Sequence, residues 1–275
     1  MSPAIAKPGE GAALGLKDDR LRWRGTAPSV RRGFGRAWRE GAGAILLCTL
    51  AWSAGPFIPT GLGAAWIAVA TLVLAGALSR ITVSADRAGA AALGLGPWGL
   101  QFGRTEARLL AAFALCAVFM ARILSVVALV LLALFGLSGL DPEAIRAREW
   151  ETVGPAWKLV LLGAVTAAGL YVVVALTARL SLFAPATAAE RRVVSLQTIA
   201  LSRGAFWSLL AGLLVTAAPS LVVVLATGLG WARGDAAWIF WAMILNGVQA
   251  PLTLAYLGTV YRRLQPTSPR ETAHG

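Results

Sequence analysis

The stretch ILSVVALVLLALFGLSGL, residues 123–140, runs for 18 residues without a charged side chain. A lipid bilayer offers the backbone no hydrogen-bond partner, so a segment that crosses it forms a helix of about 20 mainly apolar residues. Further apolar stretches lie on both sides, separated by short polar segments. The sequence therefore predicts six membrane spans, near 42–60, 61–79, 109–140, 157–178, 205–229 and 236–259.

The overall composition agrees with a membrane protein. Hydrophobic residues make up 57% of the chain and charged residues 14%, whereas an ordinary soluble domain is about 25% charged. The mean hydropathy is +0.70. We expect an all-α fold, an integral membrane six-helix bundle with short interfacial amphipathic helices. Its expected parts are a basic, partly disordered cytosolic arm over 1–41, the six-span membrane domain over 42–260, and a disordered cytosolic tail over 261–275.

The distribution of basic residues predicts the orientation in the membrane. With the N-terminus inside, the inner segments 1–41, 80–108, 179–204 and 260–275 hold 20 of the 25 Lys and Arg and only 8 of the 13 Asp and Glu. An excess of Lys and Arg marks the cytoplasmic side of a membrane protein. We therefore expect a multi-pass protein of a cell inner membrane with both termini in the cytoplasm. The net charge of +12 then faces anionic lipid and does not indicate nucleic-acid binding.

Two segments predict amphipathic structure at the inner surface. In 29–41, Val30, Phe34 and Trp38 are four residues apart and share a face on a helix, so the segment is either a short basic helix on the inner leaflet or an unstructured basic stretch. Residues 186–202 predict an amphipathic helix that begins with a capping box. The arginines of these segments are candidate contacts to lipid headgroups: Arg31, Arg32, Arg36, Arg39, Arg191 and Arg192.

Two further segments connect spans. The repeated glycines and the proline of 89–104 argue against a continuous helix, and the segment is either an interfacial loop or a re-entrant loop. On the outer side, Asp141, Pro142 and Glu143 are typical of a helix start and predict a short surface helix over about 142–153.

One part of the chain resembles a known family. The run ARLSLFAP at 178–185, Glu190, and LSRGAFW at 201–207 resemble the loop between spans four and five in bacterial six-span proteins related to the glycerophosphoryl diester phosphodiesterase membrane domain. The resemblance covers mainly 178–210. It implies the six-span architecture and no catalytic residue, because in that family the phosphodiesterase is a separate soluble domain.

Few residues within the predicted spans carry chemistry. The only histidine is His274, and we expect no catalytic, cofactor-binding or metal-binding residue. Arg122, Asn246 and Gln249 are the candidates for a polar cluster inside the membrane. Arg122 either reaches the inner headgroups or lies in the middle of the bilayer. The two amides of span six either stabilise the kink at Pro251 and bridge to a neighbouring helix, or line a pathway.

The sequence does not determine an activity. The leading interpretation is a non-enzymatic integral membrane protein, either an interaction scaffold or an envelope-maintenance factor, without a cofactor. The alternative is a carrier or binder of a lipid or small amphiphile that uses Arg122, Asn246 and Gln249. The expected partners are the bilayer with its anionic inner-leaflet lipids and a membrane protein, and not nucleic acid.

Overall fold

A computed structural model describes residues 23–101, 103–147, 154–194, 198, 205–230 and 234–264. Every regular element in these ranges is helical, and none is a strand. The chain divides into two compact units, one formed by Met1–Phe113 with Ala178–Gly275 and the other by Ala114–Thr177.

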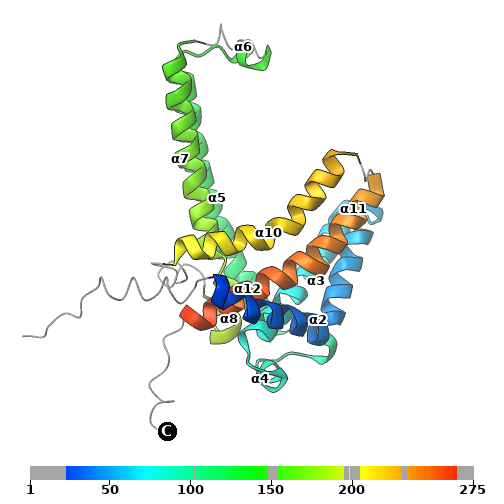
Figure 1. The fold of residues 1–275 in the computed structure, drawn as a ribbon. Helices are drawn as coiled ribbons and strands as arrows, with labels where there is room; N and C mark the ends of the chain where they lie inside the picture. The colour runs from blue at the N-terminus through cyan, green and yellow to red at the C-terminus, as the bar shows by residue number, and fades with distance from the viewer. Residues whose placement is uncertain are drawn as a thin grey trace, which may run out of the picture. The chain divides into compact units, whose positions relative to one another are not determined.

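The core of the first unit is formed by three helices, α2 (Trp23–Ala54), α3 (Thr60–Val83) and α12 (Ala250–Leu264). They pack against one another (Figure 1). The short 3₁₀ helix η1 (Gly55–Phe57) turns α2 into α3. Small buried residues such as Ala44, Cys48 and Ala77 fill the contact between α2 and α3. Close packing of small residues is how membrane helices associate where apolar burial gives no advantage over lipid.

Two further helices precede α12 in the chain. These are α10 (Phe206–Gly228) and α11 (Gly234–Met243), and the π-helix η3 (Ile244–Gln249) joins α11 to α12. Tyr256 of α12 donates a hydrogen bond to the Ser208 carbonyl at 2.7 Å. Its ring occupies the space beside Gly212, where an added Cβ would lie 2.0 Å from the tyrosine Cζ. Gly212 thus lets α10 and α12 meet through the tyrosine.

Three short elements surround this core, α4 (Arg87–Ala92), η2 (Pro97–Gly99) and α8 (Phe183–Glu190). The predicted loop over 89–104 is therefore partly helical. Trp98 has a φ of 59° and Gly99 a φ of 75°, and this turn brings Gly99 against the Gly41 backbone. The η2 segment packs on α2 through the buried Gly99, while Pro97 and Trp98 are exposed.

The second unit is a helical hairpin. It consists of most of α5 (Arg104–Ser138), the short α6 (Pro142–Ala147) and most of α7 (Ala156–Leu180). Asp141 accepts the Glu143 backbone N–H at 2.8 Å, which confirms the predicted helix start; residues 148–153 lie outside the described residues. Most apolar side chains of the hairpin are exposed, as expected where lipid is the solvent.

Five described stretches are long and apolar enough to cross a membrane: Gly61–Val83, Pro97–Ser138, Ala156–Glu190, Phe206–Gly228 and Gly234–Leu264. They overlap the predicted spans 61–79, 109–140, 157–178, 205–229 and 236–259. The predicted span 42–60 has no counterpart among them. Helix α2 ends at Ala54 before Pro56, which lacks the N–H that a continuing helix needs. Its apolar part, 41–54, reaches only about 21 Å, short of a hydrocarbon core of about 30 Å.

The two predicted amphipathic segments differ from expectation. Residues 29–41 are neither a separate surface helix nor an unstructured stretch, because they continue into 42–54 as one helix and no break marks the expected domain boundary at 41. Val30 is buried and Phe34 packs against the α12 cluster. The helix predicted over 186–202 is not continuous: residues 186–190 belong to α8, which ends at Glu190, and Arg191 has a left-handed φ of 53°. Residues 195–197 and 199–204 lie outside the described residues.

Candidate anion-binding site

A pocket of about 450 Å³ lies in the first unit where the beginning of α2, the end of α3 and the end of α12 meet. We call it the basic pocket. Its lining residues are Ser29, Arg32, Gly33, Arg36, Ile81, Thr82, Ala85, Thr259, Arg262 and Arg263. They include four arginines and no carboxylate.

Helical spacing places these side chains together. Ser29, Arg32, Gly33 and Arg36 follow the pattern i, i+3, i+4, i+7 of one helix face, and the α12 residues are spaced in the same way. Two glycines let the three helices approach one another. An added Cβ at Gly33 would lie 3.2 Å from the Ala255 Cβ, and one at Gly258 would lie 2.5 Å from the Thr82 Oγ1.

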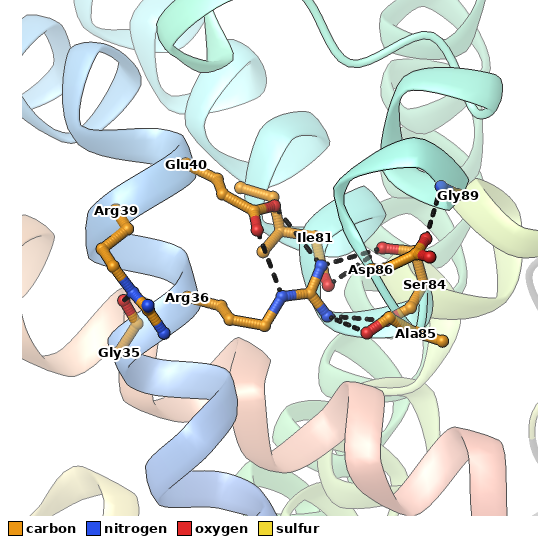
Figure 2. Close-up of polar contacts among 9 residues, drawn as sticks. All are labelled: Gly35, Arg36, Arg39, Glu40, Ile81, Ser84, Ala85, Asp86 and Gly89. Carbon is orange, nitrogen blue, oxygen red and sulfur yellow. Dashed lines mark hydrogen bonds and ion pairs between the residues drawn. The ribbon is translucent and has the colours of Figure 1, made fainter.

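Arg36 fixes the end of α3 to α2 (Figure 2). Its Nη1 donates to the carbonyls of Ser84 and Ala85, both at 2.9 Å. Its Nε and Nη2 contact the two carboxylate oxygens of Glu40 at 3.3 Å. Helix C-terminal carbonyls lack helical N–H partners and favour a cation. Arg36 therefore holds the pocket together, and Glu40 offsets its charge.

Arg263 has a similar anchoring role at the other side of the pocket. Its Nη2 donates to the Gly25 carbonyl at 2.6 Å and its Nη1 to the Thr26 Oγ1 at 3.1 Å. These bonds tie the end of α12 to the beginning of α2. Two of the four arginines are thus engaged in holding helices.

Arg32 and Arg262 are engaged far less. The Arg32 Nε donates to the Pro28 carbonyl of its own helix at 3.4 Å. Neither guanidinium forms an ion pair with a carboxylate among the described residues. The hydroxyl protons of Thr82 and Thr259 are not available to a ligand, because each hydroxyl donates to a carbonyl of its own helix at 2.8 Å.

The pocket therefore favours an anion. Guanidinium groups stay charged at any physiological pH, and their repulsion is relieved by a bound negative charge. Their fork of N–H groups matches the oxygens of a phosphate or carboxylate in bidentate geometry. Among the described residues, no group of three His, Cys, Asp or Glu could hold a metal ion.

The predicted amide pair lies elsewhere, at the π-helix η3. Pro251 lacks an N–H, and in a regular α-helix its ring would clash with the carbonyl four residues before it. The residues before it form a π-helix with i→i−5 hydrogen bonds instead, in which the Ala250 N–H donates to the Leu245 carbonyl. Asn246 is 2% exposed. It donates to the Ala242 carbonyl at 3.0 Å and accepts from the Cys48 Sγ at 3.3 Å.

Gln249 and Arg122 differ in their surroundings. The Gln249 Oε1 accepts a hydrogen bond from Ser220 of α10, so both amides contact neighbouring helices. Arg122 belongs to the second unit, is exposed, and bonds no described residue. A joint cluster of Arg122 with the two amides stays a prediction, and so does the depth of Arg122.

The six predicted headgroup arginines have four different surroundings. Arg32 and Arg36 line the basic pocket, and Arg31 and Arg39 are exposed on the neighbouring surface of α2. Arg192 pairs with Glu190 at 2.6 Å. Arg191 donates to the Ala92 carbonyl.

A buried ion pair was not anticipated from the sequence. The Arg80 Nη1 lies 2.7 Å from the Glu106 Oε1, and the two side chains are 2% and 1% exposed. The Arg80 Nε also donates to the Leu93 carbonyl at 3.1 Å. Glu106 lies just before the predicted span 109–140, inside the described stretch Pro97–Ser138 that is long and apolar enough to cross a membrane. The signal was present as opposite charges at the adjoining ends of two apolar segments.

The basic pocket also had a partial signal. The spacing of Arg32 and Arg36 on one helix face is visible in the sequence, but their meeting with Arg262 and Arg263 is not. Comparisons with known proteins do not add to the assignment: no family model, curated protein or solved structure matches this chain. The likeness of 178–210 to the six-span phosphodiesterase-related proteins therefore stays a prediction.

Proposed function

We propose that this protein is a multi-span membrane protein that binds the phosphate of an anionic lipid headgroup in the basic pocket. The observation that carries the proposal is the set of four arginines around one cavity that no carboxylate of the described residues lines. Basic pockets between membrane helices on the cytoplasmic side are typical sites for anionic headgroups.

The surroundings of the pocket support a lipid ligand. Helices α3 and α12, which form its walls, belong to two of the five stretches that are apolar enough to cross a membrane. A lipid could place its headgroup among the arginines while its acyl chains stay in the bilayer. The basic residues of the inner segments are expected to place this pocket at the cytoplasmic face of an inner membrane.

A lipid binder is the alternative interpretation of the sequence, with Arg122, Asn246 and Gln249 as its site; the site proposed here is the basic pocket instead. A non-enzymatic role as scaffold or envelope-maintenance factor is compatible with lipid binding and stays a prediction. So do a sixth span and a membrane-protein partner.

The test is lipid retention. The full-length protein is purified in detergent, exposed to equal amounts of an anionic and a zwitterionic phospholipid, and washed; the bound lipid is then quantified by mass spectrometry. We expect the anionic lipid to be enriched on the wild type and largely lost from Arg32→Gln/Arg262→Gln. The control Arg87→Gln/Arg104→Gln removes the same charge from exposed residues outside the pocket and is expected to retain the lipid. Equal retention by the two double variants would contradict the proposal.

A further inference from the structure

The charge balance within the basic pocket defines the ligand more closely. Glu40 offsets the charge of Arg36, and Arg263 uses N–H groups on Gly25 and Thr26. Arg32 and Arg262 have no carboxylate partner among the described residues. Within the part of the chain that the structure describes, the pocket thus presents two guanidinium groups, one from α2 and one from α12, whose charge no carboxylate offsets.

We infer that the pocket selects a lipid with a phosphomonoester headgroup over one with a phosphodiester. This inference rests on the proposed function and names the class of lipid. A phosphomonoester carries a charge of about −1.5 to −2 at pH 7 and three acceptor oxygens. A phosphodiester carries a single negative charge, shared by its two unesterified oxygens. Two bidentate guanidinium groups are matched in charge and in acceptors by the monoester, whereas the diester satisfies one of them.

The size of the pocket agrees with this ligand. A volume of about 450 Å³ lies within the range of about 300–1,000 Å³ that is typical of small-molecule pockets. A phosphate group and the glycerol carbons attached to it fit into this space together. The apolar side of the lining, Ile81 and Gly33, offers no donor or charge to a second polar group on the headgroup.

The four arginines divide into two that hold helices and two that remain for a ligand, and this division makes the charge of the headgroup the basis for distinguishing a phosphomonoester from a phosphodiester. Arg36 and Arg263 are fixed by bonds to Ser84, Ala85, Gly25 and Thr26. The pocket therefore keeps its shape without a ligand, and the guanidinium groups of Arg32 and Arg262 remain to bind one. Removing either guanidinium group is expected to abolish the preference for the doubly charged headgroup. Binding of a singly charged headgroup should remain.

The experiment compares two lipids that differ by one methyl group. Purified full-length protein is titrated with dioctanoyl phosphatidate, a phosphomonoester, and with dioctanoyl phosphatidylmethanol, the matching phosphodiester, at pH 7.5. Binding is followed by native mass spectrometry. We expect phosphatidate to bind about tenfold more tightly, as for one additional charge-assisted pair. Arg262→Gln should bring the ratio of the two affinities close to one, while Arg87→Gln, outside the pocket, should leave the ratio unchanged.

A third ligand separates a lipid from a soluble phosphate. Glycerol 3-phosphate carries the same phosphomonoester without acyl chains, and we expect it to bind much more weakly than phosphatidate. If glycerol 3-phosphate binds as tightly as phosphatidate, the ligand of the pocket is a soluble phosphomonoester and not a lipid.

The remaining outcomes distinguish this inference from the proposed function. Equal affinity for the two lipids in the wild type would overturn the preference for a phosphomonoester and leave an anionic-lipid site standing. Absence of binding by both lipids would overturn the proposed function itself. The comparison on the wild type does not depend on any variant folding. Where Arg262→Gln fails to fold, Arg262→Lys keeps the charge but loses the bidentate fork, and it should lower the ratio part of the way.

Discussion

At the scale of single residues, the described first unit holds two groups of charged side chains with opposite surroundings. Arg32 and Arg262 line an accessible pocket and lack carboxylate partners among the described residues. Arg80 and Glu106 are buried and paired with each other. A buried pair adds little stability by itself, but removing one partner leaves an uncompensated charge that is costly. The first group is therefore suited to binding and the second to holding α3 against the beginning of α5.

The buried pair gives a prediction about stability. Glu106→Gln should lower the free energy of unfolding by about 3–5 kcal/mol, because Arg80 stays charged in a buried site. The double variant Arg80→Met/Glu106→Leu should lose much less, since no unpaired charge remains. Denaturant-induced unfolding of the purified protein in detergent measures both. A single variant as stable as the double variant would show that the pair is accessible to water.

At the scale of elements, close helix contacts depend on glycines that face a large or polar side chain of another helix. Gly212 faces Tyr256, Gly258 faces Thr82, and Gly76 faces Glu106, whose Oε1 would lie 2.7 Å from an added Cβ. In each case the missing side chain provides the space that the neighbour fills. These contacts fix α10 to α12, α12 to α3, and α3 to α5.

The contact of α10 with α12 gives a matched pair of variants. Gly212→Ala should destabilise the protein by about 1–3 kcal/mol or more, because the new methyl group overlaps the Tyr256 ring. Gly228→Ala in the same helix meets no atom within 4 Å and should be neutral or slightly stabilising. Thermal unfolding in detergent compares the two. An equal effect of both substitutions would contradict the contact between Gly212 and Tyr256.

At the scale of the whole molecule, the described ends of the chain meet. Arg263 near the end of α12 bonds Gly25 and Thr26 at the beginning of α2. This contact, together with the inner excess of arginine, supports the proposal that both ends lie on one side of the membrane. Five stretches are apolar enough to cross by themselves. Ends on one side need an even number of crossings, so the proposal requires α2, which packs on α3 and α12, to supply the predicted sixth span.

The proposed orientation can be measured with thiol reagents. In a background with Cys48→Ala and Cys116→Ala, Arg146→Cys in α6 should react with a membrane-impermeant maleimide added to intact cells. Arg87→Cys in α4 should react only after the membrane is opened, because the excess of basic residues predicts that α4 lies on the inner side. Both arginines are exposed, so burial does not limit the reaction. Labelling of both from the same side would contradict the proposed topology.

The sequence by itself determined that the protein is helical and membrane-like, because the requirement for uninterrupted apolar stretches is local and can be counted along the chain. It also located five stretches that are long and apolar enough to cross a membrane, and the Asp141 helix start. It missed the end of α8 at Arg191. It also missed the packing of 29–41 on α12, because periodicity shows that a helix has an apolar face but not which neighbouring helix covers it. Only the tertiary structure decided that Arg32 and Arg36 meet Arg262 and Arg263, and that Arg80 meets Glu106. These side chains come from segments far apart in the sequence, and the close approach of the helices at small residues brings them together.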